Sequence, residues 1–315
     1  MRDITIFNRD GHGAEEIVAA VGLISSSITF DKWEPLLPFG IREVTGIVGP
    51  EVYAAISAFY AANEKEVDPA MTEALRYMQQ AVAFFTWLRI IPTLDAQHDI
   101  AGRSKRLGEN EKGLTALQEF KDEENILRLA YEAVDALVEC LERNEFKFWL
   151  DSRKYRIRRE CLIRSKEDFD EYYYIGSHRL FVTLLPIMRE VQQSQVAPVL
   201  GDAILRALLD GNGAEDCEQY REPASRAEAL LTMQKAVERL PVEVIPEGVV
   251  QVQQSQPVKS RLRAEQEARA AVAASLGEDA RRILERLQLM INDATASGDG
   301  SYTPGPIVHS KGMTF

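Results

Sequence analysis

The chain has 315 residues, of which 45% are hydrophobic, and its 37 Lys and Arg against 49 Asp and Glu give a formal net charge of −12. This length fits about two domains of ordinary size, and the acidic balance disfavours a nucleic-acid-binding protein that works by neutralising phosphates. The three cysteines (Cys140, Cys161 and Cys217) have neither the number nor the spacing of a disulfide framework or a zinc site.

The N-terminal stretch has no apolar signal core, and no run of the chain approaches the roughly 20 apolar residues that span a bilayer. We therefore expect a protein that has no membrane contact and that is made in the cytoplasm and stays or is assembled there.

The first half of the chain predicts a short strand over residues 3–7, followed by helices. Pro35 and Pro38 suit the first turn of one helix, and Pro50 begins a second. Asp68 suits the N-cap of a third helix, which runs to about Pro92.

Beyond this helix, residues 93–108 predict a loop or a short β-hairpin. Residues 109–144 predict a long helix with an apolar stripe that includes Leu117 and Phe120. This helix is strongly acidic, because residues 109–145 hold eleven carboxylates and four Lys or Arg.

The second half begins with a joining segment, in which residues 154–163 alternate in part and favour a strand. Ser165, with acidic residues two and three positions later, predicts a helix start. A final helix is predicted over residues 259–291, interrupted or bent near Gly277. The remaining stretch is rich in Gly, Pro and Ser and is expected to be extended.

Four blocks of sequence occur twice in the same order. "LLPFGIREV" (36–44) corresponds to "LLPIMREV" (184–191), and "EALRYMQQAV" (73–82) corresponds without a gap to "EALLTMQKAV" (228–237). Between them, Gly49 matches Gly201, and "IIP" is later matched by "VIP". The repeat predicts a tandem duplication of a helical domain, with copy 1 at residues 1–160, copy 2 at 161–296 and an extended tail at 297–315.

No set of residues predicts an active site. The glycine pairs at 11–13 and 211–213 lack the longer pattern of a phosphate loop and are interpreted as turns. Asp95, His98 and Asp99 are interpreted as solvated loop residues, since the second copy lacks an equivalent cluster. The adjacent Ser177 and His178 do not make a nucleophile and base, which must pair in space. We expect no enzyme activity, no cofactor and no metal.

Two stretches are candidates for contact with partners. The first is a basic patch, which either touches an acidic partner or pairs with the acidic helix of another copy; its residues are Arg153, Lys154, Arg156, Arg158 and Arg159. The second is the tail, which either orders on a partner or stays disordered; its candidate residues are Tyr302, Pro304, Ile307, Val308, Met313 and Phe315.

The order of these pieces resembles the head–tail connector, or neck adaptor, proteins of tailed bacteriophages, in particular those of Bacteroidetes phages and prophages, including crAss-like phages. The resemblance covers most of residues 30–295 and is carried by "IVGPEVYAAI", by "EALRYMQQAVAFFTWLRIIP", by the helix that ends in "VDALVECLERN", and by "LIRSKEDFDEYYYIGSHRLFVTLLPIMREV" with "VLGDAI". It is moderately specific, because these motifs are apolar helix patterns plus a glycine.

The resemblance implies a mainly α, connector-like domain and a structural role in the virion neck. Such proteins form a ring, commonly of twelve subunits, that joins the portal protein to other neck or tail proteins and surrounds the channel through which genomic DNA passes without specific binding. This chain departs from the simplest connectors because it carries two copies of the domain. An acidic protein suits such a channel, since it repels phosphate.

Two other hypotheses stay open. One is a cellular helical interaction module without a virion role, and the other is an enzyme whose site forms between subunits. Neighbouring portal and capsid genes would separate the connector from the interaction module, and a co-purifying ligand or metal would indicate the enzyme.

Overall fold

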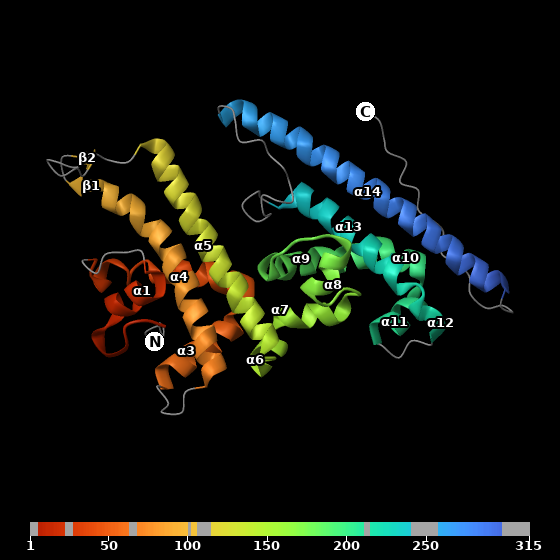
Figure 1. The fold of residues 1–315 in the computed structure, drawn as a ribbon, viewed down its shortest axis with the longest axis horizontal. Coiled ribbons are helices and arrows are strands. Elements are labelled where there is room, and N and C mark those ends of the chain that lie inside the picture. The colour runs from red at the N-terminus through yellow and green to blue at the C-terminus, as the bar shows by residue number, and fades with distance from the viewer. Residues whose placement is uncertain are drawn as a thin grey trace. The chain divides into compact units, whose positions relative to one another are not determined.

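The computed structural model describes residues 6–22, 28–62, 68–99, 102–105, 115–210, 215–240 and 258–297, and this part of the chain is mainly helical (Figure 1). The chain forms two compact units, Met1–Lys154 and Tyr155–Phe315. The repeat in the sequence predicts the boundary between the copies six residues later, after residue 160.

Unit 1 is built around two long helices, α4 and α5, which pack along each other (Figure 1). Helices α1 and α2 contact α4, and α3 contacts both α2 and α4. In chain order the elements are η1 (Arg9–Gly11), α1 (Gly13–Val21), η2 (Phe30–Lys32), α2 (Leu37–Val48), α3 (Pro50–Ala62), α4 (Pro69–Asp95), β1 (Ala96–Asp99), β2 (Gly102–Lys105), α5 (Ala116–Arg143) and α6 (Lys147–Leu150).

Unit 2 follows the same plan, with α13 packed along α14 and α9 packed on α13. Helix α7 carries the chain across the boundary between the units. The elements are α7 (Arg153–Arg156), η3 (Ile157–Glu160), α8 (Lys166–Tyr172), α9 (His178–Val191), the π-helical turn η4 (Gln192–Val196), α10 (Ala197–Leu200), α11 (Asp202–Asp210), α12 (Glu215–Glu218), α13 (Arg221–Arg239) and α14 (Val258–Ser297).

The helices begin where side chains can satisfy free backbone N–H groups. The Asp68 Oδ1 atom accepts a hydrogen bond from the backbone N–H of Ala70 at 2.9 Å, and Ser165 Oγ accepts one from Asp168 at 3.0 Å. Both predicted helix starts are therefore confirmed. Helix α5 begins at a capping box between Thr115 and Gln118, in which each side chain bonds the other residue's backbone N–H.

The repeated glycines occupy the same place in both units. Gly49 ends α2 with φ 97° and ψ 152°, and Gly201 ends α10 with φ 77° and ψ 156°. Each glycine N–H donates back to the carbonyl four residues earlier, and a new helix starts at the next residue. Residues that carry a Cβ atom rarely adopt a backbone conformation with positive φ, which explains why the break is a glycine in both copies.

The longest repeated block has the same buried face in both units. Its apolar residues recur every three or four positions and are fully buried on α4 and on α13. The buried pairs are Ala74 with Ala229, Met78 with Met233, Ala81 with Ala236, and Val82 with Val237. The block therefore builds the same helix face twice, as a duplicated domain requires.

The units differ between the repeated "REV" and the glycine. Val44 lies five residues before Gly49, whereas Val191 lies ten residues before Gly201. The five extra residues form the π turn η4, whose first residue is Gln192. The Gln192 side chain accepts a hydrogen bond from the backbone N–H of Leu162 at 2.8 Å and donates to the Glu160 carbonyl at 2.5 Å. The insertion thus places the buried side-chain amide of Gln192 where its hydrogen bonds hold residues 160–162, just before α8, against the end of α9.

Of the predicted strands that lie within the described residues, the structure confirms a hairpin and replaces one strand by helix. β1 and β2 form an antiparallel hairpin inside residues 93–108, one of the two structures expected there. The strand predicted over 154–163 is wrong, because α7 and η3 occupy most of it. Of the strand predicted at 3–7, residues 3–5 lie outside the described part, and Ile6 and Phe7 form a bend.

One predicted helix end is nearly correct, and one predicted interruption is wrong. Helix α4 continues through Pro92 and ends at Asp95, three residues beyond the predicted end. Pro92 has no N–H group, so the helix lacks one backbone hydrogen bond there. Helix α14 runs uninterrupted through Gly277. A Cβ atom at this glycine would lie 2.8 Å from the Gln234 side chain on α13. Gly277 therefore permits close helix packing and does not end the helix.

Candidate functional site

Four residues of the predicted basic patch remain available for contact. Arg153, Arg156 and Arg159 are exposed on α7 and η3, and Lys154 is half-buried. None of the four forms an ion pair with another described residue. We call these four residues the basic segment.

Arg158 does not belong to this surface, although the sequence analysis includes it. Its side chain is only 5% exposed, and its guanidinium lies 4.9 Å from the ring centre of Phe181 and 5.0 Å from that of Tyr155. In a strand, Arg156 and Arg158 would lie on the same face, but in the helical turns of α7 and η3 they point in different directions. Arg156 is therefore exposed and Arg158 is buried. Arg158 contributes to the packing of unit 2 through these cation–π contacts.

The first turns of α5 form a second exposed surface, which we call the α5 tip and define as residues 117–125. Leu117 is 63% exposed and Phe120 is 53% exposed, whereas Ile126 is 4% exposed at the point where the helix enters the core. The sequence analysis assigns Leu117 and Phe120 to the apolar stripe of the helix, but they lie outside the buried face. Exposed large apolar residues on a charged helix are typical of contact surfaces.

Three carboxylates of the α5 tip are also available for contact. Asp122, Glu123 and Glu124 are exposed, and within the described part of the chain none of them forms an ion pair. By contrast, Glu132 further along the helix is paired with Arg128 at 2.8 Å.

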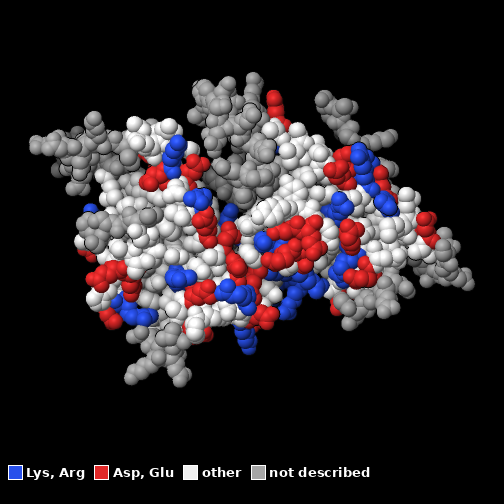
Figure 2. All heavy atoms as spheres, viewed as in Figure 1, with Lys and Arg blue, Asp and Glu red and all other residues white. Residues whose placement is uncertain are grey.

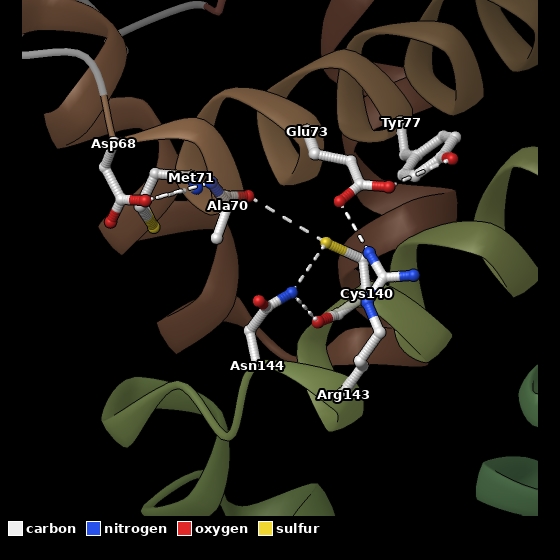
Figure 3. A network of polar contacts seen from close by, with 8 residues as sticks. All are labelled: Asp68, Ala70, Met71, Glu73, Tyr77, Cys140, Arg143 and Asn144. Atoms are coloured by element: carbon white, nitrogen blue, oxygen red, sulfur yellow. Dashed lines mark hydrogen bonds and ion pairs between the residues drawn. The ribbon is translucent and has the colours of Figure 1, made fainter.

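Figure 3 shows the polar contacts that hold the opposite end of α5 against the start of α4. Arg143 donates to Glu73 at 2.6 Å, and the Cys140 thiol lies 3.9 Å from the Ala70 carbonyl. Asn144 donates to the Cys140 carbonyl at 2.8 Å. The Arg143 bond lowers the pKa of Glu73, and burial raises the pKa of Cys140. These contacts fix the C-terminal end of α5, so the α5 tip is the far end of a helix anchored at its base.

A small open hollow lies beside η1 in unit 1, with a volume of about 430 Å³. One of its lining residues, Tyr60, donates to Glu16 at 2.8 Å, accepts from the Arg9 backbone N–H at 2.7 Å and lies 4.1 Å from the Arg9 guanidinium. Burial raises the pKa of Tyr60, and the Glu16 carboxylate raises it further. These groups satisfy one another and attach the N-terminal segment to α3.

Glu228 is a buried residue that the sequence analysis misses. It is 0% exposed on α13, and neither of its carboxylate oxygens has a well-formed hydrogen bond within the described part. Burial raises the pKa of Glu228 well above its usual range, and the backbone amide of Ile163 opposes this effect more weakly. The matching residue of the repeat is Glu73, which pairs with Arg143, so sequence alone gives no signal for this difference.

The other candidates from the sequence do not assemble a site. Ser177 is the N-cap of α9 and accepts from Leu180 at 3.0 Å, a role in helix capping. Among the described residues, no group of three or more His, Cys, Asp or Glu is placed to hold a metal ion. Three sets lie outside what the structure describes: the side chains of Asp95, His98 and Asp99, the glycine pair 211–213, and the tail residues Tyr302, Pro304, Ile307, Val308, Met313 and Phe315.

The described surface mixes both signs of charge. Figure 2 shows groups of Asp and Glu side chains next to groups of Lys and Arg on the face in view. Such a face lacks the broad basic field of a nucleic-acid-binding surface. Within the described ranges, no helix combines the length and the apolar character needed to cross a membrane.

Comparison with known proteins gives one match. No curated protein sequence and no solved structure matches the chain. A family model described as "Family of unknown function (DUF6712)" matches residues 46–159 and 191–299, together more than two thirds of the chain. Each matched stretch contains one of the two glycine breaks and the long helix pair that follows it, which is consistent with a tandem duplication. The chain therefore belongs to the DUF6712 family.

Proposed function

We propose that this protein is a structural component of a bacteriophage neck, a head–tail connector that assembles into a ring between the portal protein and the tail. The observation that carries the proposal is the doubled helical unit, in which two long antiparallel helix pairs follow matched glycine breaks. The proposal joins this architecture to the resemblance of the sequence to neck adaptor proteins.

Two exposed surfaces of the chain support a role in assembly. The α5 tip exposes Leu117 and Phe120 beside three acidic residues (Asp122, Glu123 and Glu124) that form no ion pair in the described part, and the cations of the basic segment likewise form none there. A protein that works by making contacts needs such surfaces, because apolar anchors surrounded by charge give both affinity and orientation. Under this proposal the chain binds itself, the portal protein and other neck or tail proteins.

The charge of the protein suits a channel for DNA. A net charge of −12 repels the phosphates of the genome, so DNA that moves through the ring is not retained. In this proposal the DNA passes without specific binding, and the protein performs no chemical step and requires no cofactor.

Deletion of the gene from the phage or prophage that encodes the chain tests the proposal. We expect filled heads and separate tails, which electron microscopy of the lysate would detect, and joined particles when the wild-type gene is supplied in trans. Intact, infectious particles from the deletion strain would refute a role in the neck and favour a cellular interaction module.

A further inference from the structure

The α5 tip exposes two large apolar side chains and three acidic ones that form no ion pair within the described part of the chain. From residue 117 to 125 nearly every side chain is exposed, including Leu117 at 63% and Phe120 at 53%. Residues i and i+3 lie on the same side of a helix, so Leu117 and Phe120 form one small apolar patch. Asp122, Glu123 and Glu124 lie next to this patch on the following turn.

The basic segment has the opposite charge and is equally free. Arg153, Lys154, Arg156 and Arg159 lie within two short helical turns and have no ion-pair partner among the described residues. The stacked rings of Phe146 and Phe148, 5.1 Å apart and half-buried, supply apolar surface shortly before it in the chain. The two surfaces therefore complement each other in charge, and each has apolar side chains nearby.

The two surfaces cannot meet within one unit. Glu123 and Arg143 are separated by 20 residues of continuous helix, which corresponds to about 30 Å along the axis. The anchored base of α5 leads into α6, which contacts α3 (Figure 1). The Lys154 side chain lies beside Gly49, between α2 and α3. Arg153 and Lys154 are thus at the end of unit 1 opposite the α5 tip. Arg156 and Arg159 follow within five residues of helical chain, which corresponds to about 10 Å at most. An ion pair between the α5 tip and the basic segment therefore requires a second molecule.

We propose that the α5 tip of one molecule docks on the basic segment of the next copy of the same chain. This contact joins two different surfaces in a head-to-tail manner, and a head-to-tail contact closes into a ring when the rotation between neighbours permits. The inference rests on the proposed function, for which it names the contact between subunits. Phe120 is the apolar anchor, and the charge pairs set the orientation.

Two charge-reversal variants of the full chain test the contact. The tip variant carries Asp122→Lys, Glu123→Lys and Glu124→Lys, and the segment variant carries Arg153→Glu, Arg156→Glu and Arg159→Glu. We expect each variant alone to self-associate about 100-fold more weakly than the wild type, because like charges then face each other. Sedimentation velocity would measure this loss, and circular dichroism would show that both variants remain folded.

Mixing the two variants gives the decisive result. In an equimolar mixture, the basic tip of one variant faces the acidic segment of the other, and both kinds of contact become attractive again. We expect assembly to return to the wild-type level in the mixture. Phe120→Ser should weaken assembly in every combination, because the change removes the apolar anchor and leaves the charges unchanged.

A control at an unrelated surface shows whether any local charge reversal weakens assembly, and the mixture excludes a general effect of net charge. Asp202→Lys with Arg206→Glu changes two charges on α11 whose side chains are 87% and 78% exposed, and this variant should assemble like the wild type. If the tip variant and the segment variant each assemble as strongly as the wild type, the head-to-tail contact is wrong and the ring proposal is unaffected. A wild-type protein that stays monomeric at every concentration would overturn the contact, and the gene deletion would then decide the proposed function separately.

Discussion

Glu228→Gln tests the account of the core of unit 2. The change keeps the shape of the side chain and removes its ability to ionise. Because burial raises the pKa of Glu228 in the folded protein, the folded state holds a proton that the unfolded chain releases above about pH 4.5. Raising the pH therefore favours unfolding of the wild type, and stability is lost progressively between the unfolded and the folded pKa.

The expected magnitude follows from one proton. Release of one proton on unfolding changes the free energy of unfolding by about 1.4 kcal/mol per pH unit. Between pH 5 and pH 7, the wild type should lose up to about 2.7 kcal/mol more than Glu228→Gln. The buried thiol of Cys161 does not add to this slope, because burial raises its pKa and keeps it neutral.

The repeat provides a control of opposite sign. Glu73 occupies the matching position in unit 1, and the hydrogen bond from Arg143 lowers its pKa. Glu73→Gln should therefore weaken unit 1 at neutral pH, and the difference should disappear as the pH falls through the range in which the wild-type carboxylate is protonated.

The two effects can be measured separately. All three Trp residues lie in unit 1, so tryptophan fluorescence reports the urea unfolding of that unit, and far-UV circular dichroism reports both units. Parallel pH profiles for the wild type and Glu228→Gln would refute the reasoning, because they would mean that Glu228 ionises as freely in the folded protein as in the unfolded chain.

Two further predictions concern packing and exposure. Gly40→Ala should destabilise the protein by about 1–3 kcal/mol, because the new Cβ would lie 2.6 Å from a backbone carbonyl on α4. Gly46→Ala lies on the same helix, but its new Cβ meets no atom within 4 Å, so this variant should be more stable by about 0.5–1 kcal/mol. Equal shifts of the two variants in thermal unfolding would contradict the packing of α2. In a thiol titration of the native protein, Cys217 should react first, since Cys140 and Cys161 are buried with raised pKa values; fast reaction of all three cysteines would contradict this burial.

The sequence predicts the helices and the repeat because both depend on local pattern. Asp68 and Ser165 were identifiable as caps since capping needs only a short polar side chain before a helix. Gly49 and Gly201 were identifiable as equivalent, and their similar backbone angles explain the match. The end of α4 was predicted to within three residues. The interruption near Gly277 was predicted wrongly, because packing against α13 overrides the local preference of glycine.

The contact surfaces were predictable only in part. Charge along the chain identified the basic segment, but burial of Arg158 depends on the position of Phe181 in the folded unit. Leu117 and Phe120 fit the apolar period of α5, which predicts that they are buried. They are exposed, because burial of each turn depends on residues that are distant in the sequence. For the same reason, matching glutamates of the repeat could not be separated into a surface residue, Glu73, and a core residue, Glu228.

The most direct test of the central claim is the assembly state of the purified full-length chain. Light scattering on a sizing column, followed by electron microscopy of the peak, would measure its mass and shape. The account predicts a closed ring whose mass is a multiple of that of the chain and whose central hole admits duplex DNA, about 20 Å or more. A monomer at every concentration and salt level, or an assembly without a central hole, would contradict the claim that the chain closes into a ring by itself, and the gene deletion would then decide the role in the neck.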